Sequence, residues 1–336
     1  MDGMGGRIEV REAAARSAQG SQNREAARAH MTSVLFEPSD VTPLTLVLLA
    51  DERYAMPLAT TLSSIARSNR RHWPIQVHVL QDGMSDRSRQ RVLDSVPSQS
   101  IAILWHGVNL SSFASLSTLP HISRMTYARF LIDQCLPQAL RRVLYLDTDI
   151  LVLADLEQLW RADLRGAIIG AVPDRYIDAM LNGHSGVRRE DVPRVRAYLN
   201  AGVMVIDLAR WRKACVSERS LEYLCRHPTT PYADQDALNV ACDGEWTPVD
   251  ERYNLQSHWE IDLARTESIA RPAVVHFVTS QKPWKARAVS INAAFYDAFR
   301  DQTAFRRGRV ERLHDWTLTQ WQRTKDLCAR WSRRRP

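Results

Sequence analysis

An alternation of short apolar runs with segments of helical periodicity begins at Leu44 and constrains the fold more than any other feature of the chain. The apolar runs of strand length lie at 44–50, 75–80, 101–105, 143–146, 167–172, 202–206 and 273–277. The helical segments lie at 57–68, 85–96, where Ser85 is the expected N-cap, and 124–136. This order predicts an α/β fold with a mostly parallel sheet and helices on both of its faces.

The basic charge of the chain is confined to its C-terminal end. The sequence has 336 residues and a net charge of +7, and residues 306–336 hold ten Lys or Arg against three acidic residues. This segment therefore accounts for the whole net charge, and the rest of the chain is neutral. The absence of a basic patch from the main body disfavours nucleic acid as a partner.

Composition and pattern divide the chain into three parts. Residues 1–40 lack apolar periodicity and predict a flexible leader or a loosely attached helix around Ala26, 41–300 form the folded domain, and 301–336 form a basic aromatic tail. The five cysteines include no C-x-x-C pair, which indicates a reducing compartment rather than a disulfide scaffold or a zinc cluster. No membrane-spanning run or signal peptide is visible, so the protein is expected to remain in the cytoplasm.

The triplet Asp147-Thr148-Asp149 follows the apolar run Val143–Leu146 directly. Side chains two apart on an extended strand point the same way, so both carboxylates can hold one divalent cation, which in turn can bind a diphosphate. A solvated turn or a helix cap is the alternative, because a triplet of this kind is short. The apolar residues on both sides favour the metal site, since a cation compensates the cost of placing two carboxylates among them.

Acidic residues end more than one strand of the expected sheet. Asp51 follows the first apolar run and Asp147 follows the fourth, and open α/β sheets bind ligands at the carboxyl ends of their strands. The chain contains neither a G-x-G-x-x-G nor a Walker motif. A diphosphate in this crevice would therefore be neutralised by a metal and by cationic side chains.

Five motifs in a fixed order resemble those of glycosyltransferase family 8, in particular of bacterial lipopolysaccharide galactosyl- and glucosyltransferases. They are HISRMTYARF at 121–130, VLYLDTDILV at 143–152, YLNAGVMVIDLARWR at 198–212, DQDALN at 234–239 and HFVTSQKPW at 276–284. The resemblance implies a retaining transferase with a GT-A type fold, a UDP-hexose donor (UDP-galactose or UDP-glucose) and manganese. It also implies a lipopolysaccharide or other glycan as acceptor.

The resemblance implies a role for residues spread over the whole domain. It places the metal on Asp147, Asp149 and His276, a set of two carboxylates and one imidazole that suits Mn²⁺ better than Mg²⁺ or Ca²⁺. It places Lys282 on the diphosphate, where it would stabilise the departing UDP. The remaining donor contacts that it implies are Asp51, Arg129, Thr148, Asn200, Ala201 and Thr279. Asp174 and Asp234 are further candidates for contacts with sugar hydroxyl groups in the reaction site.

Ordinary structural roles stay open for several of these residues. A lone Arg129 on a helix is commonly solvated, Lys282 could lie in a surface turn, and His276 by itself could be a hydrogen-bonded core histidine. Gly202 would allow backbone to approach a ligand closely, although a β-bulge is the alternative. The run Asp234-Gln235-Asp236 could cap a helix, because ALNVAC follows it.

The family's reaction position corresponds to Gln235, a neutral amide and therefore a poor nucleophile. We expect front-face attack through an oxocarbenium-like ion pair, with Gln235 stabilising the cation and a leaving-group oxygen taking the proton of the acceptor. A covalent adduct on Asp234 or Asp236 would contradict this expectation. The chain departs from the family pattern at Arg53, where relatives often have Asn, and at Thr279, where they have Gly.

The tail from Arg309 to Trp331 collects Leu and Trp on one helical face, bordered by Arg and Lys. This pattern is typical of an interfacial helix on an anionic membrane, and it predicts a peripheral protein on the inner face of the cell membrane with a lipid-linked acceptor. A helix docked on the protein's own core is the alternative.

Three other functions compete for the whole chain. The enzyme could transfer the sugar to a protein or a soluble glycan, or it could use the site as a nucleotidyltransferase does. The chain could also be a catalytically silent protein that binds a nucleotide sugar.

Overall fold

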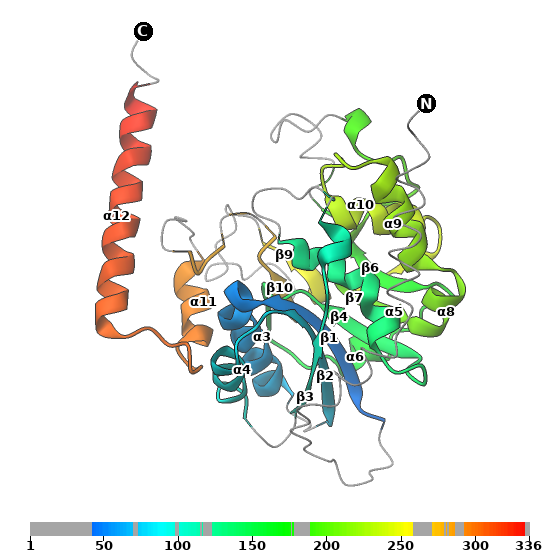
Figure 1. The fold of residues 1–336 in the computed structure, drawn as a ribbon. Helices are drawn as coiled ribbons and strands as arrows, with labels where there is room; N and C mark the ends of the chain where they lie inside the picture. The colour runs from blue at the N-terminus through cyan, green and yellow to red at the C-terminus, as the bar shows by residue number, and fades with distance from the viewer. Residues whose placement is uncertain are drawn as a thin grey trace.

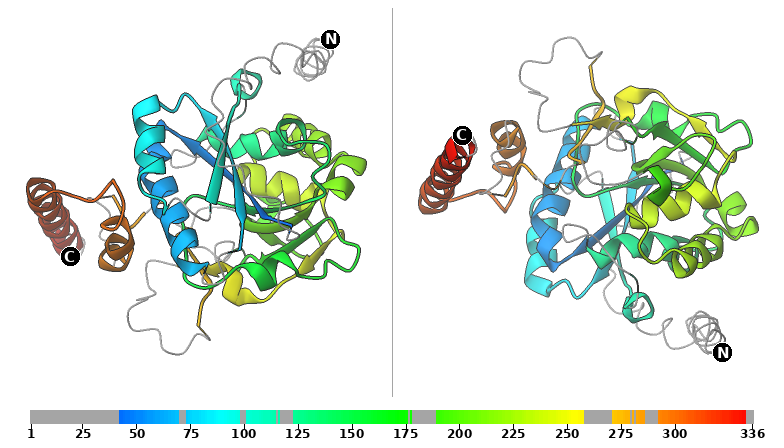
Figure 2. Two further views of the ribbon diagram at one scale, coloured as in Figure 1. Left: turned by 90° about the horizontal axis from the view of Figure 1, so that it is seen from below. Right: turned by 90° about the horizontal axis from the view of Figure 1, so that it is seen from above.

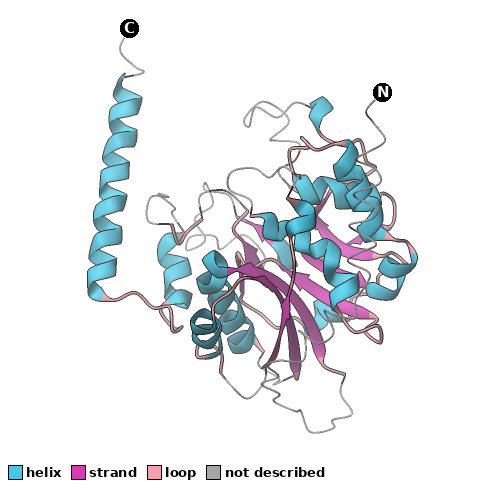
Figure 3. Cartoon of the chain, viewed as in Figure 1, coloured by secondary structure: helices cyan, strands magenta, loops and turns pink. Residues whose placement is uncertain are grey.

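This computed structural model of the chain describes residues 42–69, 73–97, 101–114, 116, 123–175, 177, 189–257, 271–278, 280, 282–285 and 292–332. The expectations for the leader over 1–40 and for Thr279 lie outside these residues. Within them, a central sheet carries helices on both faces, and one long helix stands apart from this body (Figures 1 and 3).

The central sheet has seven strands in the order β3-β2-β1-β4-β7-β6-β8. Their bounds are Leu44–Asp51 (β1), Ile75–Asp82 (β2), Ile101–Gly107 (β3), Arg142–Leu146 (β4), Ile169–Pro173 (β6), Leu199–Asp207 (β7) and Trp246–Pro248 (β8). The pairs among β1 to β4 are parallel, β7 is antiparallel to β4 and β6, and β8 is parallel to β6. The prediction of a mostly parallel sheet is therefore confirmed, with the antiparallel β7 as its main exception.

Alternate residues of β1 face two separate hydrophobic clusters. Leu46 and Leu48 pack on the side covered by α3 (Ala55–Ser68) and α4 (Asp86–Leu93). Val47 and Leu49 pack on the opposite side, in a cluster that includes buried residues of 125–136, 208–224 and 233–241, and Figure 2 shows helices on both sides of the sheet. This double burial explains why the strand is a continuous apolar run rather than an alternating one.

A second, smaller sheet has the strand order β5-β10-β9, formed by Ile150–Val152 (β5), Val274–His276 (β10) and Leu255–Gln256 (β9). Only the triplet Asp147–Asp149 separates β4 of the central sheet from β5 of this one. The acidic triplet therefore lies where the chain crosses between two sheets. β10 pairs antiparallel with β5, and this pairing sets His276 opposite Ile150, next to the triplet.

The other helices of the body follow the sequence prediction with one correction. Residues 124–136 form a 3-10 helix, Arg124–Leu131 (η3), and then a short α5, Ile132–Cys135, rather than one continuous helix. Ser85 caps α4 as expected, whereas α10 begins at Ala233 and has no side-chain cap, so Asp234 lies inside its first turn. The remaining elements are η1 (Glu52–Tyr54), η2 (Ser111–Phe113), α6 (Glu157–Trp160), η5 (Arg189–Asp191), α8 (Leu208–Lys213), α9 (Val216–Arg226), α10 (Ala233–Ala241), η6 (Glu251–Asn254) and α11 (Ala293–Arg300).

The basic tail forms the long helix α12, Arg309–Ser332, which lies beside α11 and away from the sheet in the three views (Figures 1 and 2). Its root is held by Arg307, which is ion-paired with Asp297 of α11 and with Asp315 of α12. The exposed fractions are 81% for Val310, 63% for Leu313, 59% for Trp316 and 50% for Trp321. These four apolar side chains are therefore not docked on the core. Among the residues that the structure describes, no helix is both long and apolar enough to span a bilayer.

Candidate active site

Two carboxylates and one imidazole converge at the crossing between the sheets. Asp147, Asp149 and His276 each offer a ligand atom, and these atoms lie within 4.8 Å of one another. His276 and Asp149 are largely enclosed, with side-chain exposures of 5% and 14%, whereas Asp147 is 26% exposed. The cluster is thus buried on one side and open on the other, as a site that must admit a ligand has to be.

Gly202 creates the space that the imidazole occupies. The backbone N–H of Asp147 donates to the carbonyl of Gly202 at 2.8 Å, so β7 lies directly beside the triplet. A Cβ on Gly202 would overlap Cε1 of His276 and lie 2.7 Å from its Nδ1. The close approach expected of this glycine is real, and the group that approaches is a side chain of the protein itself.

The hydrogen bonds of His276 fix which ring nitrogen faces the carboxylates. Its Nδ1 lies 3.0 Å from Asn254 Oδ1, while Nδ2 of Asn254 donates to Asn200 Oδ1 at 2.8 Å. Because the amide oxygen of Asn254 can only accept, Nδ1 is the nitrogen that donates to it, and in the neutral ring Nε2 holds the lone pair. Asn254 is the last residue of η6 and belongs to no motif, so it was not predicted from the sequence.

One carboxylate oxygen at the centre of the cluster, Asp149 Oδ1, lacks a hydrogen-bond donor in the part of the chain that the structure describes and could instead bind a cation. Asp149 Oδ1 is buried and receives no hydrogen bond from the described residues, and it lies 3.2 Å from Nε2 of His276. Two lone pairs therefore face each other, and a divalent cation shared between them would satisfy both. The chemistry of the donor set, two hard oxygens and one imidazole, agrees with this interpretation.

Lys282 belongs to the same cluster and not to a surface turn. Its Nζ donates to Asp149 Oδ2 at 2.5 Å and to the carbonyl of Phe277 at 2.6 Å, and the residue is buried. Although burial alone would raise the pKa of Asp149, the ammonium group of Lys282 holds that pKa below its ordinary value. Asp149 is therefore kept as a carboxylate, the form that binds metal.

Arg129 is a buried bridge between two acidic residues. Its guanidinium pairs with Asp234 Oδ2 at 2.7 Å and with Asp147 Oδ1 at 3.2 Å, and the hydroxyl of Tyr145 donates to the same Asp147 oxygen at 2.6 Å. The alternative of a solvated helix face is thus wrong for Arg129, whose side chain is only 4% exposed. The implied contact with the donor stays a prediction.

A hydrogen-bonded network of Asn200, Ala201, Asp174 and Gln235 lies between the Asp147–Asp149–His276 cluster and the expected reaction position. Asn200 Nδ2 and Gln235 Nε2 both donate to Asp174 Oδ2, at 3.0 and 3.1 Å. The N–H of Ala201 donates to Gln235 Oε1 at 3.0 Å. The four residues come from β7, α10 and the end of β6, so the sheet and α10 together position an amide beside the acidic cluster.

The outer members of the predicted site are held by local contacts. Asp51 Oδ1 accepts the N–H groups of Arg53 and Tyr54, and its Oδ2 accepts from Ser123. Thr148 is buried, and its carbonyl accepts from Thr61 at 3.0 Å. Burial, and then the charges of Asp149, Asp51 and Asp147, raise the pKa of Tyr54, a residue that was not predicted from the sequence.

The model of glycosyl transferase family 8 matches residues 45–288 of this chain. General stress protein A of Bacillus subtilis is 26% identical over 255 residues, which cover 72% of this chain and 87% of that protein. Lipopolysaccharide 1,2-glucosyltransferase of Escherichia coli K12 is 26% identical over 257 residues, which cover 73% of this chain and 74% of that protein.

A solved structure supports the same assignment. The galactosyltransferase LgtC, crystallised with donor and acceptor sugar analogs, superposes with a TM-score of 0.66 at 27% identity, covering 77% of this chain and 96% of LgtC. That structure has the GT-A fold, which agrees with the α/β sheet and flanking helices seen here. The chain belongs to glycosyltransferase family 8 and is a hexosyltransferase.

Proposed function

We propose that this enzyme transfers a hexose from UDP-galactose or UDP-glucose, with retention, to a lipopolysaccharide or other glycan acceptor. The observation that carries the proposal is the convergence of Asp147, Asp149 and His276 within 4.8 Å at the edge of the sheet. The names of the relatives, a lipopolysaccharide glucosyltransferase and a galactosyltransferase crystallised with sugar analogs, favour this donor and acceptor class.

In this proposal Asp147, Asp149 and His276 hold Mn²⁺, which when bound neutralises the donor diphosphate and acts as a Lewis acid on it. When the donor binds, the ammonium group of Lys282 leaves Asp149 and contacts phosphate oxygens. It then stabilises the negative charge that develops on the departing UDP. The Nζ atom of Lys282 lies beside the proposed metal position, because it contacts Asp149 Oδ2 at 2.5 Å. Asp51, Thr148, Arg129 and Thr279 are proposed to contact the nucleotide and diphosphate.

The sugar would lie against the amide chain of Asn200, Ala201, Asp174 and Gln235. Their donors and acceptors are already held at hydrogen-bond distance from one another by the fold, so they suit the hydroxyl groups of a hexose. Selectivity between galactose and glucose would then depend on which hydroxyl this network meets.

We infer front-face attack because neither aspartate beside Gln235 is free to act as a nucleophile. Asp234 is buried in its ion pair with Arg129 at 2.7 Å. Asp236 is fully buried and accepts hydrogen bonds from Tyr198, Thr230 and Tyr232. Gln235 alone of the three is partly exposed. Its amide oxygen can stabilise an oxocarbenium-like cation, although it forms no covalent intermediate readily.

The domain division is proposed in the same way. Residues 41–300 form the catalytic unit, 1–40 form a leader, and 301–336 form a tail that binds the inner face of an anionic membrane and so brings the enzyme to a lipid-linked acceptor. The exposed Trp and Leu side chains of α12 support this role for the tail.

The test is UDP release from a panel of UDP-sugars in the presence of Mn²⁺. Asp149→Asn should reduce turnover on the order of 10²–10³-fold, because it removes one charged ligand without changing the shape of the side chain. Glu218→Gln, an equal change at an exposed position on α9, should leave turnover unaltered. Full activity of Asp149→Asn, or no turnover with any UDP-sugar, would refute the proposal.

A further inference from the structure

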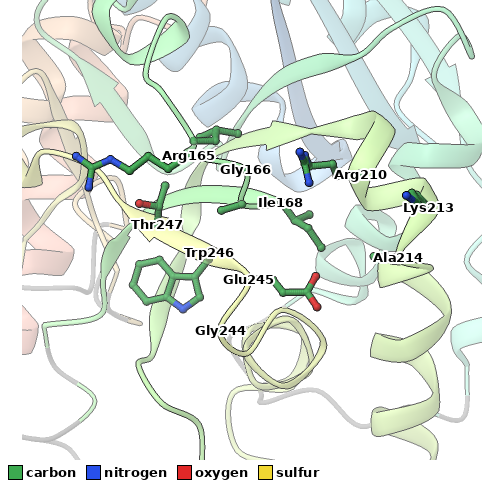
Figure 4. Close-up of a pocket in the computed structure, with 12 residues that line it drawn as sticks. Arg165, Gly166, Ile168, Arg210, Lys213, Ala214, Gly244, Glu245, Trp246 and Thr247 are labelled. Atoms are coloured by element: carbon green, nitrogen blue, oxygen red, sulfur yellow. The ribbon is translucent and has the colours of Figure 1, made fainter.

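A cavity of about 590 Å³ lies at the end of the central sheet opposite the active site (Figure 4). One wall is the turn Leu164–Ala167 before β6, the second is α8, and the third is the segment 244–247 that enters β8. β6 runs from this cavity to Asp174 in the active site, a path of roughly 20 Å at the rise of a strand. Binding in the cavity and catalysis are therefore separable.

The turn at the rim of the cavity carries an arginine where glycine or asparagine is favoured. Arg165 and Gly166 have φ values of 50° and 81°, and the N–H of Ala167 donates to the carbonyl of Leu164 at 2.8 Å. These features define a type I′ turn, in which a long side chain at the first central position is strained. Strained positions of this kind are retained more often at functional sites than elsewhere.

The cavity is cationic, and two of its cations have no carboxylate partner. Figure 4 shows Arg165 on one side and Arg210 and Lys213 of α8 on the other. Arg210 is paired with Asp207 at 3.4 Å. Within the part of the chain that the structure describes, neither Arg165 nor Lys213 forms an ion pair. An acidic group would compensate these two charges.

An aromatic ring and one carboxylate complete the surface. The indole Nε1–H of Trp246 donates to the carbonyl of Ala197 at 3.3 Å, which fixes a half-buried ring at the wall of the cavity. Ile168 lines the cavity beside it. The exposed Glu245 can accept hydrogen bonds from hydroxyl groups. The apolar face of a sugar ring packs well on an aromatic side chain of this kind.

We propose that this cavity binds an anionic saccharide, a sugar that carries a phosphate or a carboxylate. Its acid group is held by the cations, its ring packs on Trp246 and its hydroxyl groups donate to Glu245. The proposal does not depend on the donor or acceptor of the reaction, because the cavity and the metal cluster are at opposite ends of the sheet.

The test uses the full-length protein with UDP and Mn²⁺ present in excess, so that the active site is occupied. Glucose 6-phosphate, inorganic phosphate and glucose are titrated separately, and binding is followed by calorimetry. Glucose 6-phosphate should bind at least about tenfold more tightly than either fragment, since only it engages both the cations and the ring. Equal binding of inorganic phosphate would reduce the cavity to an ion site, and no binding of glucose 6-phosphate would also overturn the proposal.

Three variants of cavity residues and one control variant test where glucose 6-phosphate binds. Trp246→Ala and Lys213→Met should each weaken glucose 6-phosphate binding by about tenfold, while Arg87→Met, an exposed cation on α4, should not change it. Arg165→Gly should weaken binding and at the same time raise the thermal midpoint by roughly 2–4 °C, because glycine relieves the strained turn. Opposite changes in binding and stability cannot come from unfolding. Unaltered binding in all three variants would place the ligand elsewhere and refute the site.

Discussion

Asn254 Oδ1 lies 3.0 Å from His276 Nδ1, and Nδ2 of the same asparagine donates to Asn200 Oδ1 at 2.8 Å. The orientation of this amide is fixed, because Asn200 Oδ1 also accepts the N–H of Gly202 at 3.1 Å and so needs a donor from Asn254. One buried side chain therefore orients His276, a proposed metal ligand, with its oxygen and Asn200, a residue of the expected sugar site, with its nitrogen.

The two ends of Asn254 can be tested separately. Asn254→Leu removes both contacts and should weaken Mn²⁺ binding by about 10–100-fold, because the imidazole loses the partner that orients it. Asn254→Asp keeps an acceptor for Nδ1 and should retain the metal affinity of the wild type, but it should raise KM for the donor because the bond to Asn200 is lost. Electron paramagnetic resonance of Mn²⁺ gives the affinity independently of turnover. Equal metal affinity in all three proteins would contradict the role of Asn254.

A methyl group at position 202 should dismantle the metal cluster. The Cβ of Gly202→Ala would lie 2.7 Å from His276 Nδ1 and 3.0 Å from Asp147 Oδ2, in a central strand that cannot move aside. We expect loss of Mn²⁺ binding and a destabilisation of about 1–3 kcal/mol, measured by metal titration and chemical unfolding. Gly107→Ala is the matched control, because its Cβ would meet only Gln81 at 3.8 Å. Normal metal binding by Gly202→Ala would show that the imidazole is not where the structure places it.

Acid should destabilise the protein through a pair of histidines on β2 and β3. His78 Nδ1 and His106 Nε2 lie 2.8 Å apart, and burial, followed by the charge of His106, lowers the pKa of His78 to about 3. In the unfolded state His78 takes up a proton near pH 6.5, whereas in the folded state it does so only near pH 3. The free energy of unfolding therefore falls as the pH drops from 6.5 towards 3. His78 contributes a slope of about 1.4 kcal/mol per pH unit over that range.

Urea unfolding at pH 7, 6 and 5 measures this slope. His78→Leu removes the proton uptake of this residue and should give a shallower dependence of the free energy of unfolding on pH, whatever its effect at pH 7. Parallel pH profiles for the two proteins would show that His78 titrates normally in the folded state.

Removal of α12 should separate membrane binding from catalysis. A chain that ends after Gly308 keeps the ion pair of Arg307 with Asp297 and loses the exposed Trp316 and Trp321. We expect it to release UDP within about twofold of the full-length rate and to lose binding to vesicles of anionic lipid, measured by co-sedimentation. Binding of the full-length protein should weaken with added salt, because the Arg and Lys side chains of the helix contribute by charge. Unchanged vesicle binding by the shortened chain would refute the membrane role.

The sequence alone determined the α/β class, seven of the strands and the residues that meet at the Asp147–Asp149–His276 cluster, but it did not predict the short strands β5, β8 and β9. Apolar runs of strand length and helical periodicity depend on local pattern, and the five motifs mark Asp147, Asp149, His276 and Lys282 individually. Local pattern did not predict the break of 124–136 into a 3-10 helix, whose Tyr127 and Phe130 lie in the core, and a short α-helix.

Only the tertiary structure decided how these residues are connected. Arg129 and Asp234 form an ion pair although 105 positions separate them in the sequence, and Asn254 reaches His276 from a segment without any motif. The cationic cavity likewise joins a turn, a helix and a strand that are distant in the chain. Hydrogen bonds and ion pairs act over a few ångströms, so they depend on which segments the sheets bring side by side, and that is a property of the folded chain rather than of local sequence.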